Sequence, residues 1–436
     1  MHTITAISTA HGAGGIGIVR LSGDKAFEIA EKCFTSSVPF GEQKERELRL
    51  GKFNGEHFEE KCMCVKFVAP FSYTGEDVVE FHVHGGVFLT RRVLETLIKK
   101  GAKLAECGEF TQRAVLNGKM SLSEAEGVAD MISADSAVAL NCAYRQMTGK
   151  LNIVIEKLQQ DIEEMLVATS AAIDYPEEVE EDVYNFVPKE ITRIKNEVYK
   201  LLKSAEKGRY VKNGILVAIV GKPNSGKSSF LNAVLGRERA IVTDIEGTTR
   251  DTIEESILHG GVKIRFLDTA GIRESEDVVE KVGIERAKIE SKGADVVIVL
   301  LDGTKEKPDD EDELISLYEG KKVFICLNKC DGEIVRKDSY RKISAKTGEG
   351  IDLLLDEIAS LVGVEDGEII TEARHTEALS DAYNALSSAE QTASDITIDC
   401  TTVDIREAWL SLGKITGKTA DDDIIDGVFK KFCVGK

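Results

Sequence analysis

The sequence of 436 residues predicts a multidomain protein that combines α/β parts with an all-α part. Residues 1–117 alternate strand-like and helical patterns, which is typical of a small α/β domain. Residues 118–212 and 371–436 carry apolar side chains at helical spacing. Residues 213–370 form a second α/β domain around a glycine-rich loop. The simplest interpretation is one helical domain interrupted by an inserted α/β domain, in line with the length of the chain.

Charge and cysteine content narrow the class of protein. The formal net charge of −20 argues against nucleic-acid binding over a broad surface of this chain alone, because the negative charge would repel phosphates. The nine cysteines include no C-x-x-C pair, and Cys62 and Cys64 are interpreted as buried thiols rather than metal ligands. No apolar segment is long enough to span a bilayer, and Met1-His2-Thr3 starts no signal peptide. We therefore expect a cytoplasmic protein.

The first α/β domain contains two patterns that suggest ligand binding. Gly12–Gly17 matches G-x-G-x-x-G, but the residues after it predict a strand rather than the helix that a dinucleotide site requires. We interpret these glycines as a turn or as room for a ligand. Alternation with period two in Val78–His84 places Glu80, His82 and His84 on one strand face. A solvated or ligand-facing surface is favoured there over a metal site.

Helices account for the segments on either side of the inserted domain. Apolar residues recur at helical spacing at Leu151, Ile155, Leu158, Ile162 and Met165. The acidic run Pro176–Asp182 is interpreted as a solvated loop that interrupts this pattern. Helical patterns resume up to residue 202, and after the insertion they cover residues 373–393, 403–412 and 423–432.

The inserted domain is organised around Gly221–Ser228, which fits the P-loop pattern G-x-x-x-x-G-K-[ST]. An apolar strand pattern leads into the loop and a helical pattern leads out, as the motif requires. The glycines let backbone N–H groups turn towards phosphate oxygens, and the helix N-terminus adds partial positive charge. Lys227 is expected to reach the β- and γ-phosphates, and Ser228 to hold Mg²⁺. The nucleotide contacts expected here are Asn224, Ser225, Gly226, Lys227, Ser228 and Ser229.

Three further motifs indicate that the nucleotide is GTP. D-x-x-G follows one strand pattern, where Asp268 suits a water-mediated bond to Mg²⁺. N-K-x-D follows another; the Asp331 carboxylate can accept from two guanine donors that adenine does not present in that arrangement, and the Lys329 stem covers the base. The S-A-K motif offers backbone N–H groups to the guanine oxygen. These motifs contribute Asp268, Thr269, Ala270, Gly271, Asn328, Lys329, Asp331, Ser344, Ala345 and Lys346, and their order predicts a Ras-like P-loop G domain.

The hydrolysis machinery departs from a common pattern. Many GTPases place a glutamine just after D-x-x-G to orient the attacking water, but this position is Ile272, which cannot hydrogen-bond water. Help must come from another side chain, a cation or a partner, and the residues alone leave these alternatives open. Thr248 and Thr249 lie where a threonine that closes over Mg²⁺ is needed.

Eight motifs together resemble one known family. They are Ile4–Thr9, Gly14–Gly23, Gly108–Thr111, Arg113–Ala114, Leu116–Lys119, Thr243–Asp251, Asp268–Arg273 and the terminal Cys433–Lys436. On these residues, and over essentially its whole length, the chain resembles the tRNA-modification GTPases called MnmE or TrmE. The family usually ends in Cys-Ile-Gly-Lys, so Val434 is a mild departure.

The resemblance implies a homodimer joined through the N-terminal domains and a potassium-dependent GTPase whose G domain splits the helical domain. It implies an FAD-containing partner, MnmG or GidA, in a hetero-oligomer. Together the two would attach an aminomethyl or carboxymethylaminomethyl group to carbon 5 of the wobble uridine of certain tRNAs. The one-carbon unit would come from 5-formyltetrahydrofolate or a related tetrahydrofolate bound by the N-terminal domain. The partner could supply much of the basic tRNA surface that this acidic chain lacks.

Positions carried over from the family complete the predicted sites. The folate contacts are Arg20, Glu80, Lys119 and Lys436. Potassium falls to Asn224, Thr243, Ile245 and Thr248, and Mg²⁺ to Ser228 and Thr249. The loop Thr243, Asp244, Ile245, Glu246, Gly247 and Thr248 also contacts GTP. The catalytic residues are Glu280 and Cys433. Glu280 would orient the attacking water, which Ile272 cannot do. The motif does not define the chemical role of Cys433.

A second function class fits the inserted domain equally well. A GTP-driven assembly switch, for example on the ribosome, would need the same G domain and no covalent chemistry. The N-terminal domain and the terminal Cys-Val-Gly-Lys favour RNA modification, since a pure switch has no evident use for a folate pocket.

Overall fold

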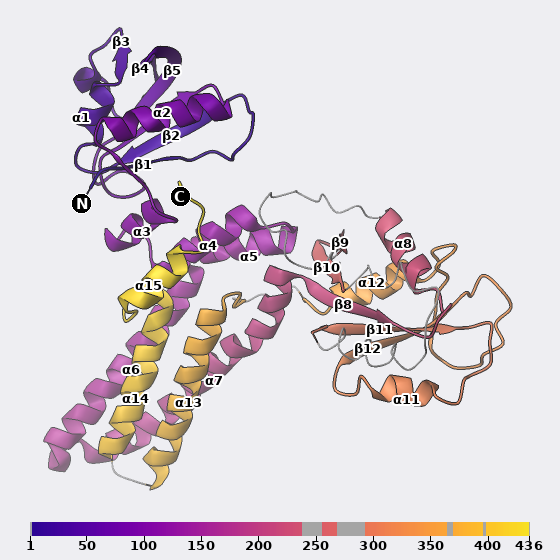
Figure 1. Ribbon diagram of the computed structural model, residues 1–436. Helices are drawn as coiled ribbons and strands as arrows, with labels where there is room; N and C mark the ends of the chain where they lie inside the picture. Colours follow the sequence, from indigo (N-terminus) through magenta and orange to yellow (C-terminus); the bar gives the residue numbers. More distant parts are fainter. Residues whose placement is uncertain (1, 238–254, 268–292, 364–368, 396–397, 436) are drawn as a thin grey trace. The chain divides into compact units, whose positions relative to one another are not determined.

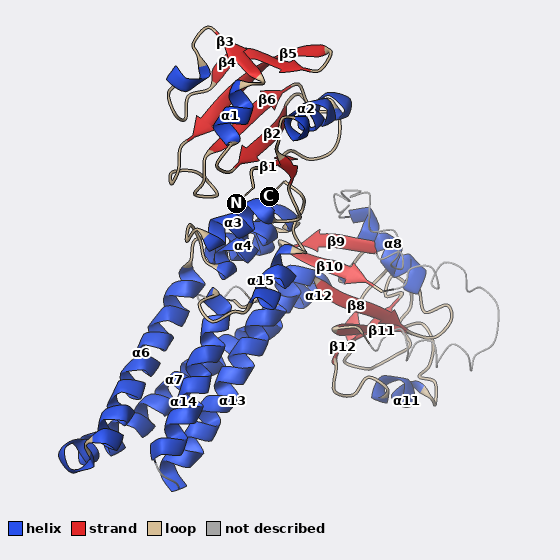
Figure 2. Cartoon of the chain, turned by 60° about the vertical axis from the view of Figure 1, so that its left-hand side comes forward, coloured by secondary structure: helices blue, strands red, loops and turns tan. Residues whose placement is uncertain are grey.

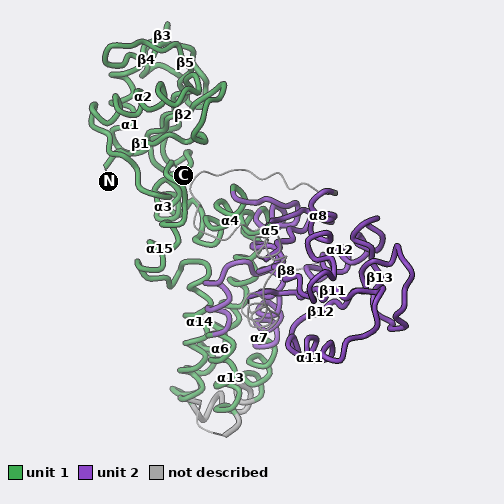
Figure 3. Tube along the Cα trace, turned by 45° about the vertical axis from the view of Figure 1, so that its right-hand side comes forward, with its two compact units in different colours: residues 1–132, 144–194, 381–436 green, residues 133–143, 195–380 purple. Residues whose placement is uncertain are grey.

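The computed structural model describes residues 2–237, 255–267, 293–363, 369–395 and 398–435. The chain divides into two compact units, coloured separately in Figure 3. The first comprises residues 1–132, 144–194 and 381–436, and the second comprises residues 133–143 and 195–380. The first unit holds a sheet and a set of long helices, and the second holds a mainly parallel sheet with helices. The predicted fold class, a multidomain α/β plus all-α protein, is confirmed.

The first unit begins with a mixed sheet (Figure 1), whose strands follow the order β3-β4-β5-β6-β2-β1-β7. Neighbouring strands are antiparallel, except for the parallel pair of β1 and β7. Helices α1 (Ala26–Glu31) and α2 (Val87–Lys99) pack on one face of this sheet and share a buried core with it. The remaining elements are β1 (Ile4–Ile7), β2 (Gly17–Ser22), β3 (Phe34–Ser36), the 3₁₀ helix η1 (Phe40–Glu42), β4 (Arg49–Gly55), β5 (Phe58–Phe67), β6 (Val78–Val83) and β7 (Lys103–Leu104).

Alternation along β6 separates a buried face from a polar face. The odd-numbered residues from Val79 to Val83 are buried in the core beneath the helices, and Glu80 and His82 lie on the other face, as predicted. On the neighbouring β5, the unpaired thiols of Cys62 and Cys64 are buried in the same core, also as predicted. Alternate residues of the strands therefore face opposite sides of the sheet, with apolar side chains in the core and polar side chains on the other face.

The glycine-rich stretch before β2 forms no dinucleotide fingerprint. No helix follows it, because β2 begins at Gly17, as the sequence predicted. A Cβ atom on Gly17 would lie 2.4 Å from Thr90 Cγ2, and one on Gly85 would lie 2.6 Å from the Gly14 carbonyl oxygen. Glycine is needed here because two backbone segments approach each other closely beside the start of α2.

Long helices form the rest of the first unit, and Figure 2 shows them in blue. Gln159 on α6 donates to the Trp409 carbonyl on α14 at 3.2 Å, and Arg193 on α7 pairs with Asp161 on α6 at 2.6 Å. The helices are α3 (Glu109–Leu116), α4 (Leu122–Ser133), α5 (Ala137–Met147), α6 (Lys150–Asp174), α7 (Pro176–Asn213), α13 (Ala373–Asp395), α14 (Ile398–Thr416) and α15 (Asp422–Phe429), of which α5, α7, α13 and the last residue of α4 are shared with the second unit. None of the helices among the described residues is long and apolar enough to cross a membrane.

The prediction that residues 176–182 form a solvated loop was wrong. Helix α6 ends at Asp174, and α7 begins at once with Pro176 and continues through the acidic run. Proline is favoured in the first turn of a helix because no N–H partner is needed there, and acidic residues are favoured next to the positive end of the helix dipole. The same residues that suggest a loop therefore also suit a helix start.

The C-terminal segment returns to the N-terminal part of the first unit. Phe429 and Phe432 are buried against Leu122 on α4, and Gln112 on α3 donates to Asp426 on α15 at 3.1 Å. Beyond α15, Val434 forms a single antiparallel bridge with Cys107. The two ends of the sequence are thereby joined within one folded unit.

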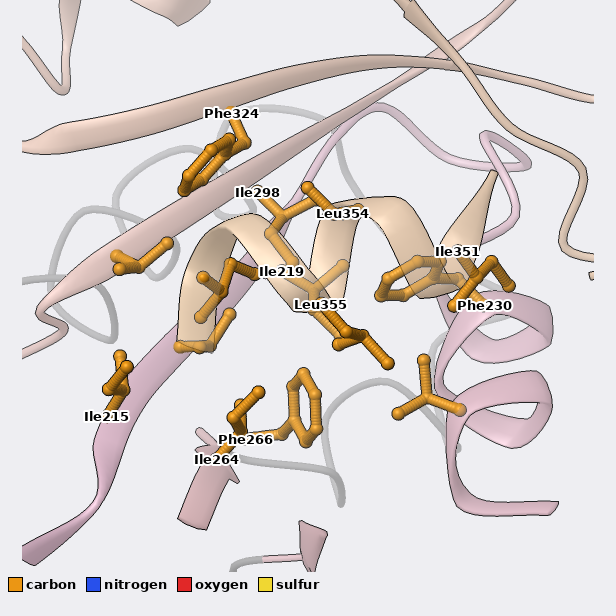
Figure 4. Close-up of a cluster of buried hydrophobic side chains, with 14 of the residues drawn as sticks. Ile215, Ile219, Phe230, Ile264, Phe266, Ile298, Phe324, Ile351, Leu354 and Leu355 are labelled. Carbon is orange, nitrogen blue, oxygen red and sulfur yellow. The ribbon is translucent and has the colours of Figure 1, made fainter. Parts of the chain in front are cut away.

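The second unit contains a six-stranded sheet in the order β13-β12-β11-β8-β10-β9, parallel except for the hairpin of β9 and β10. Strand β11 is buried on both faces, as expected for a central parallel strand. Its alternate residues face two cores, one beneath α8 and α12 (Figure 4) and one beneath α11. The elements are β8 (Ile215–Val220), α8 (Lys227–Arg237), β9 (Glu255–His259), β10 (Val262–Phe266), β11 (Val296–Asp302), α11 (Glu311–Ser316), β12 (Lys322–Asn328), β13 (Arg341–Lys342) and α12 (Ile351–Ala359).

The two ends of the inserted segment lie side by side within the second unit. The Ile370 N–H donates to Ser204 Oγ on α7 at 3.1 Å. A Cβ atom on Gly208 would lie 1.8 Å from the Ile370 carbonyl oxygen, so only glycine allows α7 to come this close. The end of the inserted segment therefore packs against α7, the helix that leads into its start.

Candidate functional site

The P-loop connects β8 to α8 at the carboxyl edge of the parallel strands, where ligands bind in open α/β sheets. Gly226 has a φ of +96°, and a Cβ atom there would lie 2.2 Å from Asn328 Nδ2. Asn224 is also left-handed, with a φ of +64°. Ser228 and Ser229 lie in the first turn of α8. A tight loop with left-handed residues at these positions is the kind of backbone that can turn N–H groups towards an anion.

The Lys227 ammonium lies inside this loop. Its Nζ donates to the carbonyl oxygens of Gly221 at 2.8 Å and Lys222 at 3.0 Å. Burial lowers the pKa of Lys227 below its ordinary value. A phosphate beside it would oppose that shift, because a negative charge favours the protonated amine.

The side chain of Asn328 joins three loops. It is 1% exposed; its Nδ2 donates to the Ser225 carbonyl at 2.8 Å and its Oδ1 accepts from the Ala345 N–H at 2.9 Å. The N-K-x-D motif is therefore tied to both the P-loop and the S-A-K motif. These bonds bring the phosphate-binding and base-binding segments together.

The Asp331 carboxylate is arranged as an acceptor. Its Oδ1 accepts from Ser344 Oγ at 2.7 Å, and the Lys346 ammonium lies 3.7 Å from Oδ2. The bond from Ser344 is the main cause that holds the pKa of Asp331 below its ordinary value, with Lys346 adding to it. The carboxylate is therefore ionised at neutral pH, which is the form that accepts from the guanine ring N–H and amine.

Sequence reasoning missed Asp302. Lys329 Nζ donates to Asp302 Oδ2 at 2.7 Å, and Lys329 itself has a left-handed φ of +67°. A signal was present, because Asp302 ends the apolar strand pattern Val296–Leu301, and a charged residue at the carboxyl end of a parallel strand points to the ligand edge.

Several predicted site residues lie outside the part of the chain that the structure describes. They are Thr243, Asp244, Ile245, Glu246, Gly247, Thr248, Thr249, Asp268, Thr269, Ala270, Gly271, Glu280 and Lys436. Their assignments as nucleotide, metal, catalytic and folate residues stay predictions.

A second polar cluster lies in the first unit. Arg20 on β2 and Glu80 on β6 are paired in register, and Arg20 Nε donates to Glu80 Oε1 at 2.8 Å. Glu80 Oε2 lies 3.2 Å from His82 Nε2. The Arg20 guanidinium also lies 5.6 Å from the ring centroids of Tyr73 and Phe110. Although burial raises the pKa of Glu80, the bonds from His82 and Arg20 outweigh it and leave the pKa below its ordinary value.

The other predicted folate residues approach this cluster only in part. Lys119 is exposed, and its Nζ donates to the Pro70 carbonyl, in the loop that also carries Tyr73. Ser8 Oγ, just past β1, donates to the Gly435 carbonyl at 3.2 Å, which places the tail next to the strand that pairs with β2. The exposed Cys433 accepts at its carbonyl from the Gly108 N–H at 3.3 Å.

A P-loop at the edge of a parallel sheet, tied through Asn328 to an N-K-x-D motif, defines a GTP-binding protein of the P-loop class. Residues 3–119 match the family described as GTP-binding protein TrmE N-terminus, and residues 122–433 match MnmE helical domain. The chain is 40% identical over 457 residues to the tRNA modification GTPase MnmE of Clostridioides difficile, covering 100% of this chain and 99% of that protein. It is 41% identical over 455 residues to the protein of the same name from Acetivibrio thermocellus, with the same coverage.

The chain belongs to the MnmE (TrmE) family and is a GTPase, as its motifs predicted. Among solved structures, the G domain of the T. maritima FeoB iron transporter is similar, with 26% identity and a TM-score of 0.25 over 34% of this chain and 97% of that one. At that TM-score the likeness adds nothing to the family assignment.

We predict that Asp331→Asn weakens GTP binding by about 10- to 100-fold and favours xanthosine triphosphate, because two guanine donors lose a charged acceptor. Titration of both nucleotides measures the preference. Glu333→Gln, the same chemical change on an exposed residue of the same loop, is the control and should leave both affinities unchanged. An Asp331→Asn protein that still prefers GTP would refute the role of this carboxylate.

Proposed function

We propose that this GTPase, with an FAD-containing MnmG (GidA) partner, modifies carbon 5 of the tRNA wobble uridine. The group added is aminomethyl or carboxymethylaminomethyl, and its one-carbon unit comes from a tetrahydrofolate. One observation carries this proposal: relatives called tRNA modification GTPases align over the whole chain, including the N-terminal and helical parts that lie outside the G domain. A homodimer joined through the N-terminal domains accompanies it.

We assign four segments to this function. Residues 1–117 form the folate-binding and dimerisation domain, residues 118–212 and 371–436 form the helical domain, and residues 213–370 form the G domain. The packing of α15 against α3 and α4 supports a functional link between the first and last segments.

The residues of the G domain have separate roles in binding and hydrolysing GTP. Lys227 neutralises phosphate charge, and Ser228 and Thr249 would hold Mg²⁺, which would supply charge stabilisation at the phosphates. The hydroxyl of Ser228 in the first turn of α8 is the kind of oxygen ligand that Mg²⁺ takes. Potassium is assigned to Asn224, whose side-chain amide offers an oxygen beside the phosphates, with Thr243, Ile245 and Thr248. Glu280 is assigned to the attacking water, since Ile272 cannot hold it.

The folate site is assigned to the Arg20–Glu80 cluster. The carboxylate can accept from a pterin ring, the partly exposed ring of Tyr73 offers an apolar face, and cations suit the anionic glutamate tail of a folate. Lys119 and Lys436 supply such cations. Cys433 belongs to the same terminal motif as Lys436, and we assign it no chemical step.

An assembly switch without covalent chemistry is the alternative, and nucleoside analysis separates the two. We expect tRNA from cells that lack this protein to lose the carbon-5 modification of its wobble uridines. Reintroducing the wild-type gene should restore the modification. Unchanged wobble uridines would overturn the proposed function and favour the switch.

Hydrolysis should depend on potassium and on Glu280. A cation beside Asn224 can offset charge that develops between the β- and γ-phosphates, so replacing K⁺ by Na⁺ at equal ionic strength should slow turnover strongly. Glu280→Ala should lower kcat by about 100-fold with a smaller change in GTP affinity, and Glu276→Ala, in the same stretch of sequence, should not. Equal rates in the two salts would remove the cation from the mechanism.

The folate site should also require the end of the chain. Deleting Gly435 and Lys436 removes a cation from the tail that Ser8 holds, so binding of 5-formyltetrahydrofolate should weaken while GTP affinity stays intact. Isothermal titration of both ligands measures this, with Lys431→Ala, an exposed cation of the same segment, as control. Full folate affinity in the truncated protein would assign the tail to some other task.

A further inference from the structure

A carboxylate at the end of β11 is placed to act on the base-binding loop. Asp302 is the last residue of β11 and pairs in register with Asn328, the last residue of β12. Lys329 follows directly, so the parallel register brings it beside Asp302. The hydrogen bond of 2.7 Å between Lys329 Nζ and Asp302 Oδ2 is the result of this register.

The Asp302 side chain is itself held in place. Its Oδ1 accepts from the Thr304 N–H at 3.1 Å and from Thr304 Oγ1 at 2.6 Å, which leaves Oδ2 for the lysine. The side chain is 12% exposed. A second cation, Lys305, lies 4.0 Å from Oδ2 and is 69% exposed, which is too distant for a hydrogen bond.

Asp302 is ionised at neutral pH. Burial raises its pKa, but the bonds from Lys329 and Thr304 outweigh burial and bring the pKa below its ordinary value. The contact with Lys329 is therefore a charge-assisted hydrogen bond, which is stronger than a neutral one.

Backbone bonds fix the distance between the two side chains. The Gly303 N–H donates to the Asn328 carbonyl at 2.9 Å, and the Val335 N–H donates to the Gly303 carbonyl at 3.1 Å. A Cβ atom on Gly303 would lie 2.9 Å from the Asn328 oxygen. Backbone hydrogen bonds therefore tie the turn after β11 to the N-K-x-D loop.

We propose that Asp302 is a positioning residue for the nucleotide base: anchored by Thr304, it holds the Lys329 side chain so that its aliphatic stem lies against the base face. This proposal deepens the proposed function and rests on guanine nucleotide binding at this loop. The stem contacts the face of the base, whereas Asp331 accepts hydrogen bonds from the edge of the base. Asp302 therefore sets how long the base stays bound, and Asp331 sets which base is chosen.

Release of fluorescently labelled GDP from the full chain tests the proposal. Asp302→Ala should speed dissociation by about tenfold, because Lys329 loses a charge-assisted bond. The ratio of GTP to xanthosine triphosphate affinity should stay unchanged. Lys305→Ala, the neighbouring exposed cation, is the control and should dissociate at the wild-type rate.

A matched pair at Thr304 probes the anchor without removing the carboxylate. Thr304→Val removes the hydroxyl and should speed GDP release in the same direction as Asp302→Ala, to a smaller extent. Thr304→Ser keeps the hydroxyl and should restore the wild-type rate. Equal rates for the two variants would overturn the anchoring role, even if Asp302→Ala failed to fold.

A double-mutant cycle separates positioning from general stability. If Asp302 acts through Lys329, then adding Asp302→Ala to Lys329→Ala should change GDP release no further. Additive effects, a wild-type rate in Asp302→Ala or an altered nucleotide ratio would each overturn the proposal. A wild-type chain that bound no guanine nucleotide would instead refute the proposed function.

Discussion

The buried amide of Asn328 is the constraint on which the nucleotide-binding edge depends. Its two polar atoms bond to the P-loop at Ser225 and to the S-A-K motif at Ala345, so one side chain sets the spacing between the phosphate and base segments. A buried amide that lost either partner would leave a polar group unsatisfied, which is costly. The Asn328 side chain also explains why residue 226 is a glycine, since Nδ2 occupies the space that a Cβ atom on Gly226 would need. The P-loop glycine therefore serves both phosphate approach and the packing of Asn328.

Contacts distant in sequence hold the first unit together. The left-handed Gly108, at a φ of +67°, has no room for a Cβ, which would lie 2.9 Å from Phe432 Cβ. Around it, Phe429, Phe432 and Leu122 form a buried apolar cluster. Burial of aromatic side chains is a large favourable term, and it offsets the entropy of closing a loop of more than three hundred residues. Because of this packing, Val434 and Gly435 lie next to the N-terminal sheet, beside Cys107 and Ser8.

Buried ion pairs position loops in both units. Arg113 on α3 donates to Glu76 at 3.0 Å and to Glu109 at 2.7 Å, and its side chain is 6% exposed. In the second unit, Arg336 donates to Glu311 through two bonds, with both side chains 2% exposed. Such pairs add little net stability because both charges lose water, but breaking one leaves an unpaired buried charge. They favour one arrangement of the loops over its alternatives.

The sequence by itself determined the fold class, the strand–loop–helix context of the P-loop and the polar face at Glu80. Each of these follows from a local pattern: apolar periodicity, glycine spacing or strand alternation. The acidic run at the start of α7 misled the prediction, because local composition suits both a solvated loop and a helix start that follows directly on α6. Tertiary structure alone decided which residues meet across the sheet. Asp302 joins Lys329 only through the parallel register of β11 and β12, and Gly435 reaches Ser8 only through the packing of the last helices. Register and helix packing depend on contacts between distant segments, which no local pattern in the chain specifies.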